Sequence, residues 1–188
     1  MPRYLAALAI VLLIGMVLAR VALLRSKGIE AVKFGKTHKT DFLLPPFALF
    51  YIYLIFAAAF SWPTPARQRL FESQAAAWLG VLLCMLGVLL FLWGIVSFGK
   101  SFRVGIDTDQ PDQLVTTGAF AVTRNPLYAA FALVLLGEFL VFPHWLLLLY
   151  LAAGTWLFHR QVLREEGYLK QHHGKDYLEY SRRVRRYI

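Results

Sequence analysis

The sequence predicts an all-α fold, an integral membrane bundle of about five transmembrane helices with a C-terminal helical hairpin and an amphipathic cytoplasmic tail. Of the 188 residues, 59% are hydrophobic and only 16% are charged. The mean hydropathy is +0.55, which is too apolar for an ordinary soluble domain. The apolar residues also gather in long runs between short polar segments, as membrane helices do.

Charge and cysteine content exclude several classes of function. The formal net charge is +9. On a membrane protein a basic excess is first explained by the cytoplasmic bias of Lys and Arg, so we predict no nucleic-acid partner. The single cysteine, Cys84, lies inside an apolar run and excludes an intrachain disulfide and a cysteine-based metal cluster. We predict no bound metal.

The first part of the chain, residues 1–98, is predicted to form three spans. Basic residues mostly follow the first apolar run, which favours a retained helix with its N-terminus outside over a cleaved signal peptide. Glycines recur every seven residues in the third run and predict a helix face that a neighbouring helix can approach closely: Gly80, Gly87 and Gly94. The three predicted spans are Tyr4–Leu24, Phe42–Trp62 and Ala75–Phe98.

The second part, residues 99–188, is predicted to form the catalytic region, built from a loop, the hairpin and the tail. The hairpin arms, Leu127–Phe142 and Trp145–Phe158, are near or below the roughly 17 residues that cross a bilayer. We therefore expect a tight, tilted hairpin or arms that reach part of the way. Glu138 lies inside the first arm, and His144 at the bend is its expected partner.

The distribution of charge predicts the topology. Sixteen of the twenty Lys and Arg fall in the first loop, the third loop and the tail. Five spans with the N-terminus outside place all three of these segments in the cytoplasm. This puts Arg124 and Glu165 on the same side, and we expect a bacterial inner membrane. Gly174 is expected to break the amphipathic tail in two.

The first candidate cluster lies where the third loop meets the hairpin, in the stretch L-V-T-T-G-A-F-A-V-T-R-N-P-L-Y. Asn125 is predicted as a helix N-cap and Pro126 as the first helical residue. A helix start beside Arg124 would seat a carboxylate or phosphate. The alternative is that N-P merely begins a helix and that Arg124 reaches the lipid headgroups.

The second cluster, Arg164-Glu165-Glu166, follows the hairpin, which brings it to the first. A glutamate pair suits an ammonium group or sugar hydroxyls, so the two clusters together could hold a zwitterion such as an amino acid moiety. An alternative for Glu166 is a helical pair with Lys170.

Together these clusters resemble the C-terminal catalytic region of the isoprenylcysteine carboxyl methyltransferase and phospholipid methyltransferase superfamily. The resemblance covers roughly Phe102 to Arg186 and is carried by the joint spacing of R-x-P-x-Y, E-E and G-x-x-Y-x-x-Y. It implies an integral membrane methyltransferase that uses S-adenosylmethionine and takes a lipophilic acceptor, a carboxylate or an amine, from the membrane lipid. The sequence carries no signal on the oligomeric state.

The resemblance also implies roles for individual residues. Arg124 would order the mouth of the site, and Arg160 or Arg164 would handle the charge of the acceptor. Tyr128 and Glu165 would hold the amino acid end of the cofactor. The implied cofactor contacts are Asp112, Gln113, Leu114, Val115, Phe120, Asn125, Pro126, Leu127, Tyr128 and Glu165.

The sequence departs from the family pattern at two positions and leaves two rival functions open. Asn125 stands where the family has histidine, so this position can donate a hydrogen bond but cannot act as an acid or base. Gln161 replaces an arginine linked to a carboxylate substrate in eukaryotic members. The rivals are an NADPH-dependent membrane reductase of the sterol and steroid type and a non-enzymatic membrane scaffold or carrier.

Overall fold

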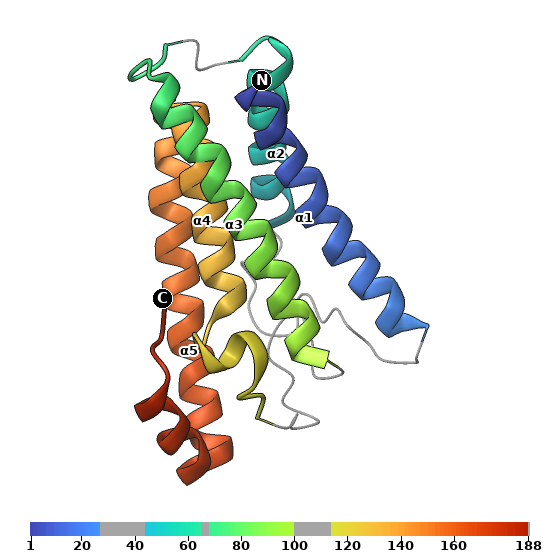
Figure 1. Cartoon of the computed structure of the whole chain (residues 1–188), viewed down its shortest axis with the longest axis vertical. Helices are drawn as coiled ribbons and strands as arrows, with labels where there is room; N and C mark the ends of the chain where they lie inside the picture. The colour runs from blue at the N-terminus through green and yellow to red at the C-terminus, as the bar shows by residue number, and fades with distance from the viewer. Residues whose placement is uncertain (27–43, 65–67, 100–113, 188) are drawn as a thin grey trace.

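The computed structural model describes residues 1–26, 44–64, 68–99 and 114–187, and within them the protein is a helical bundle (Figure 1). Neighbouring α-helices run in alternating directions, and the described residues contain isolated bridges but no sheet. The elements are α1 (Pro2–Arg25), α2 (Leu44–Phe60), α3 (Gln74–Phe98), the short 3-10 helix η3 (Gly118–Ala121), α4 (Pro126–Val141) and α5 (Trp145–Arg183). The predicted all-α membrane bundle is confirmed.

Three helices, α1, α3 and α5, are long and apolar enough to cross a membrane by length and composition. The other two are shorter, with 17 residues in α2 and 16 in α4. At 1.5 Å per residue α4 is about 24 Å long, less than the roughly 30 Å of a hydrocarbon core. This agrees with a first hairpin arm that reaches part of the way. The predicted start of the second span at Phe42 lies outside the described residues.

The second arm of the hairpin and the part of the tail before Gly174 form one continuous helix, which the sequence did not predict. Helix α5 has 39 residues and continues past Phe158 because no proline interrupts it, and Gly167 stays within the helix. At Gly174 the backbone adopts φ 50°, a conformation that glycine tolerates best, and the predicted break is confirmed. The polar residues of the second candidate cluster are therefore carried by a rigid extension of the hairpin.

Helices α3 and α4 pack closely along the glycine face of α3, as the seven-residue spacing predicted. A Cβ placed on Gly80 would lie 2.5 Å from the carbonyl oxygen of Gly137, and one placed on Gly87 would lie 2.6 Å from Cγ2 of Val134. One on Gly94 would lie 2.7 Å from Cδ2 of Leu127. These contacts fix the height of α4 against α3 and thereby position its first turn.

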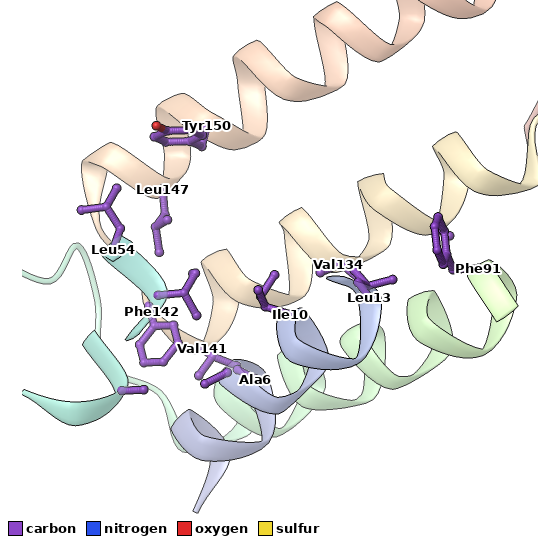
Figure 2. Packing of buried hydrophobic residues seen from close by; sticks show 14 of the residues in the cluster. Ala6, Ile10, Leu13, Leu54, Phe91, Val134, Val141, Phe142, Leu147 and Tyr150 are labelled. Carbon is purple, nitrogen blue, oxygen red and sulfur yellow. The ribbon is translucent and has the colours of Figure 1, made fainter. Parts of the chain in front are cut away.

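A continuous hydrophobic core joins the helices (Figure 2). Side chains of α1 and α4 meet in its middle, and the aromatic ring of Phe91 on α3 is 1% exposed. The labelled core residues are Ala6, Ile10, Leu13, Leu54, Phe91, Val134, Val141, Phe142, Leu147 and Tyr150. Large apolar side chains also cover the outside of the bundle, for example Leu89 and Leu149, as expected for a lipid-facing surface.

The bend of the hairpin is tied to the segment before α3, and this overturns the predicted Glu138–His144 pair. The backbone N–H of Leu70 donates to the carbonyl of Pro143 at 2.7 Å. Nδ1 of His144 lies 3.2 Å from the carbonyl oxygen of Gln68, so the partner of this ring is Gln68 and not Glu138. Glu138 is fully buried, and neither carboxylate oxygen has a hydrogen-bond partner among the described residues.

Candidate active site at the start of helix α4

The first cluster is anchored to the end of α3 through η3. The hydroxyl of Ser97 accepts a hydrogen bond from the backbone N–H of Ala119 at 2.9 Å. Gly118 has φ 63°, and a Cβ there would lie 2.3 Å from that hydroxyl oxygen, so the close approach requires glycine. Phe120 is buried against Phe98, with ring centroids 4.8 Å apart. These contacts fix the path of the chain into α4.

Helix α4 begins as predicted, with Asn125 at the N-cap position and Pro126 as the first residue. The Asn125 side chain does not cap the helix, however. Its Nδ2 group donates to Oε1 of Glu166 at 3.2 Å and to the carbonyl of Arg186 at 3.1 Å. The Asn125 amide thus serves as a double donor that joins α4, α5 and the end of the chain.

Glu166 is the centre of an ionic network. Its Oε2 atom accepts two hydrogen bonds from the Arg186 guanidinium, at 3.0 Å from Nε and 2.9 Å from Nη2. Its Oε1 atom lies 3.5 Å from Nη2 of Arg124, and the side chains of Arg124 and Glu166 are only 13% and 11% exposed. The alternative pair with Lys170 is wrong, because the carboxylate faces away from solvent. The hydrogen bonds to Glu166 raise the pKa of Arg186 above its ordinary value.

Glu165 points to the other side of the site and has a different set of partners. Its Oε1 atom accepts from the Tyr128 hydroxyl at 2.6 Å and from Nε2 of Gln161 at 3.1 Å. A short bond of this kind is typical of a hydroxyl donating to a carboxylate. No Lys, Arg or His pairs with Glu165 within the described ranges. The half-buried carboxylate is therefore hydrogen-bonded but not neutralised.

The end of the chain, residues 184–187, forms the remaining wall, and we call it the C-terminal strap. After Gly174 the chain turns back along α5 (Figure 1), and Arg185 forms a parallel bridge with Thr123. The N–H of Arg124 donates to the carbonyl of Arg185 at 2.9 Å. The Tyr187 hydroxyl lies 2.9 Å from Nδ1 of His159 on α5. The strap therefore holds both clusters together.

The sequence analysis included Tyr177 in the G-x-x-Y-x-x-Y spacing but gave it no role in the site, and it did not single out Arg186. Tyr177 is 4% exposed, and its hydroxyl lies within electrostatic range of Arg124, Glu166 and Arg186. A run of arginines near a terminus usually indicates a solvated segment, so the pattern R-R-V-R-R-Y did not predict that Arg186 belongs to the site. The useful signal was the break at Gly174, which lets the chain return to the hairpin.

The remaining predicted site residues lie at varied distances from this network. Arg160 and Arg164 are exposed, and the Arg160 guanidinium lies over the Trp156 ring, 4.8 Å from its centroid. Pro126 and Leu127 face Gly94 on α3. Leu114 and Val115 are half-buried in the segment that leads to η3, and Asp112 and Gln113 lie outside the described residues. The roles predicted for these residues stay predictions.

A family model described as phospholipid methyltransferase matches residues 75–176, more than half of the chain. The chain belongs to this family. The match runs from α3 into α5 and includes Arg124, Asn125, Tyr128, Glu165 and Glu166. It confirms the resemblance inferred from the spacing of these residues. Tyr177 and the C-terminal strap of this phospholipid methyltransferase family member lie beyond the matched part.

Individual relatives come from plants. Protein-S-isoprenylcysteine O-methyltransferase B of Arabidopsis thaliana is 31% identical over 108 residues, which cover 56% of this chain and 55% of that protein. A probable protein-S-isoprenylcysteine O-methyltransferase of Oryza sativa subsp. indica is 26% identical over 116 residues, covering 60% and 61%. The family member thus spans little more than half the length of the curated relatives it matches. No solved structure matches it.

Proposed function

We propose that this protein transfers a methyl group from S-adenosylmethionine to a lipophilic acceptor that carries a carboxylate or an amine. The observation that carries the proposal is Glu165, a half-buried carboxylate with two neutral donors and no cation, placed across the site from the cationic Arg124. A carboxylate removed from water is costly unless a positive group joins it. The site therefore favours a ligand that brings its own cation.

The opposite side of the site favours an anion. Arg124 stands at the start of α4, where unpaired N–H groups and the helix dipole attract negative charge. The Nε atom of Arg124 is buried and has no hydrogen-bond partner among the residues that the structure describes. A buried donor of this kind is stabilised by an acceptor on a ligand. A site in which Glu165 can bind a cation and Arg124 can bind an anion fits the ammonium and carboxylate groups at the amino acid end of S-adenosylmethionine.

The proposed reaction requires little chemistry from the protein itself. The bound cofactor would supply an activated methyl group, which moves to the acceptor's lone pair as the carbon–sulfur bond breaks and its electrons stay on sulfur. The residues of the site would bind, orient and exclude water. Phe158 lies beside both Tyr128 and Phe131, with ring centroids 5.8 Å and 5.5 Å apart. This aromatic surface leads from the polar site toward the apolar half of the hairpin, where a lipophilic acceptor would lie.

The proposal is tested by binding and by label transfer with the full-length protein in lipid nanodiscs. We expect S-adenosylhomocysteine to bind and NADPH not to bind, and Glu165→Gln to weaken the former about tenfold or more, since a charge-assisted contact is lost. Glu179→Gln, an exposed carboxylate further along α5, is the matched control and should have no effect.

Transfer of label from S-adenosylmethionine identifies the acceptor. The names of the plant relatives make a small prenylated cysteine with a free carboxylate the first acceptor to try, with phosphatidylethanolamine as the amine alternative. Binding of NADPH, or unchanged affinity for S-adenosylhomocysteine in Glu165→Gln, would contradict the proposal.

A further inference from the structure

We propose that Tyr177 is a further binding residue, whose hydroxyl holds the carboxylate of the methyl donor together with Nε of Arg124. Arg186 is then a positioning residue, because it pairs with Glu166 and so leaves Arg124 to bind that carboxylate. This inference rests on the proposed function, since it concerns the same donor. Both residues lie beyond the stretch that the family model matches. Tyr177 is part of the G-x-x-Y-x-x-Y spacing, but that spacing assigns it no partner in the site.

The first step concerns two buried donors without partners. Nε of Arg124 and the hydroxyl of Tyr177 are both shielded from solvent, and neither makes a hydrogen bond of normal geometry to any described residue. Buried polar groups are nearly always satisfied, so two such donors in one site indicate a missing acceptor. The Arg124 guanidinium acts on the Tyr177 hydroxyl through its charge and through a side-chain interaction, which places the two groups near each other. The hydroxyl oxygen accepts in that interaction, so its proton stays available to a ligand. A carboxylate has two oxygens and can accept from both.

The second step concerns charge. Without Arg186, Glu166 would be a buried carboxylate with Arg124 as its single cationic partner, and Arg124 would be neutralised by it. Arg186 instead takes Oε2 of Glu166 through two hydrogen bonds, while Arg124 keeps a longer contact of 3.5 Å to Oε1. The three side chains together are net positive. This net positive charge lies beside the start of α4, and it would stabilise the carboxylate of a ligand there.

The third step concerns how Arg186 is held. Its carbonyl accepts hydrogen bonds from the Thr123 hydroxyl and from Nδ2 of Asn125, both at 3.1 Å. The strap is therefore attached to the residues directly before α4, and its guanidinium reaches Glu166 on α5. Arg186 contacts neither of the two unpartnered donors in the hydrogen-bond network, so it acts on the ligand through Glu166.

Two probes separate a role toward the carboxylate from a structural role. S-adenosylhomocysteine carries the amino acid end, and 5′-methylthioadenosine has the same nucleoside and thioether without it. In nanodiscs we expect Tyr177→Phe and Arg186→Ala each to weaken S-adenosylhomocysteine about tenfold and to leave methylthioadenosine within about twofold. Arg182→Ala, at an exposed arginine in the last turn of α5 outside the C-terminal strap, is the matched control and should change neither.

A double variant tests the route through Glu166. Arg186→Ala leaves Glu166 competing for Arg124, and adding Glu166→Gln removes that competition and restores the net positive charge. We therefore expect the double variant to recover most of the lost affinity for S-adenosylhomocysteine. No recovery would overturn the positioning role of Arg186.

The remaining outcomes are also decisive. Equal loss of both probes in Tyr177→Phe or Arg186→Ala would show a structural role and overturn the inference, as would wild-type affinity in those variants. If the wild-type protein binds neither probe, the proposed function itself fails and the inference falls with it. Binding by the wild type with unaffected variants rejects the inference alone.

Discussion

At the scale of single residues, neighbouring side chains of the same type have opposite environments. Glu165 and Glu166 follow one another on α5, yet Glu166 is neutralised by two arginines while Glu165 receives only a hydroxyl and an amide. The 100° turn between successive helical residues directs one carboxylate to α4 and the other to the C-terminal strap. Two adjacent acids can therefore serve different parts of one ligand site.

Tyr128 gives a prediction about Glu165 as the group that binds the cation of the ligand. Tyr128→Phe removes the 2.6 Å hydrogen bond to Glu165 and keeps the aromatic contact with Phe158. We expect about tenfold weaker binding of S-adenosylhomocysteine in calorimetry, because the carboxylate loses the donor that orients it. Tyr53→Phe, which removes a hydroxyl bonded to the carbonyl of Pro63, serves as the control. Unchanged binding in Tyr128→Phe would argue against Glu165 as the group that binds the cation of the ligand.

Glu138 gives a prediction about stability. It is fully buried in α4, and both oxygens lack hydrogen-bond partners within the described part of the chain. An unpaired carboxyl group in an apolar interior costs about 1–3 kcal/mol, so Glu138→Leu should raise the thermal unfolding temperature in detergent by several degrees. A lower unfolding temperature would mean that the carboxyl group has a stabilising partner in the membrane.

At the scale of the elements, the site depends on the register between α3 and α4. A close glycine interface fixes this register, and the end of α3 also carries Ser97, which holds η3. The same packing that stabilises the hairpin therefore sets the position of Arg124 and Asn125. Changes far from the site should act on it through this interface.

The interface gives a third prediction. A Cβ at Gly137 would lie 2.5 Å from the carbonyl oxygen of Gly80 and 2.6 Å from Sγ of Cys84. Gly137→Ala should therefore destabilise the fold by roughly 1–3 kcal/mol, because backbone and a buried side chain must move. In Gly15→Ala the new Cβ meets nothing within 4 Å, and helix propensity should make it neutral or stabilising. Equal unfolding temperatures for the two variants would contradict the proposed register.

At the scale of the whole molecule, the described helix ends place the site at one end of the bundle. The C-terminal ends of α1 and α3, the start of α4 and the polar part of α5 are all at the same end of the bundle, opposite the N-terminus (Figure 1). A guanidinium nitrogen of Arg20 on α1 donates to the carbonyl of Gly99 at the end of α3. A cation at this position also complements the helix dipole. We propose that this end faces the cytoplasm.

Orientation is the fourth prediction. In a Cys84→Ser background, single cysteines replace Glu72 at the hairpin-bend end and Lys175 at the site end, both exposed. A thiol reagent that does not cross membranes should label the cysteine at 72 in intact cells and the one at 175 only after lysis. The reverse pattern would place the site outside.

Sequence alone determined the helical membrane class, the glycine interface, the start of α4 and the break at Gly174, because these follow from local chemistry and residue periodicity. The sequence also predicted that Arg124 and Glu165 lie at the same end of the bundle, because the second arm of a short hairpin runs back to the end where the first arm began. Only the tertiary structure decided that Glu166 pairs with Arg186, that Tyr177 lies beside Arg124, and that His144 contacts Gln68 and not Glu138. Such contacts join segments up to 76 residues apart, and their geometry depends on helix rotation and packing, which no local pattern encodes.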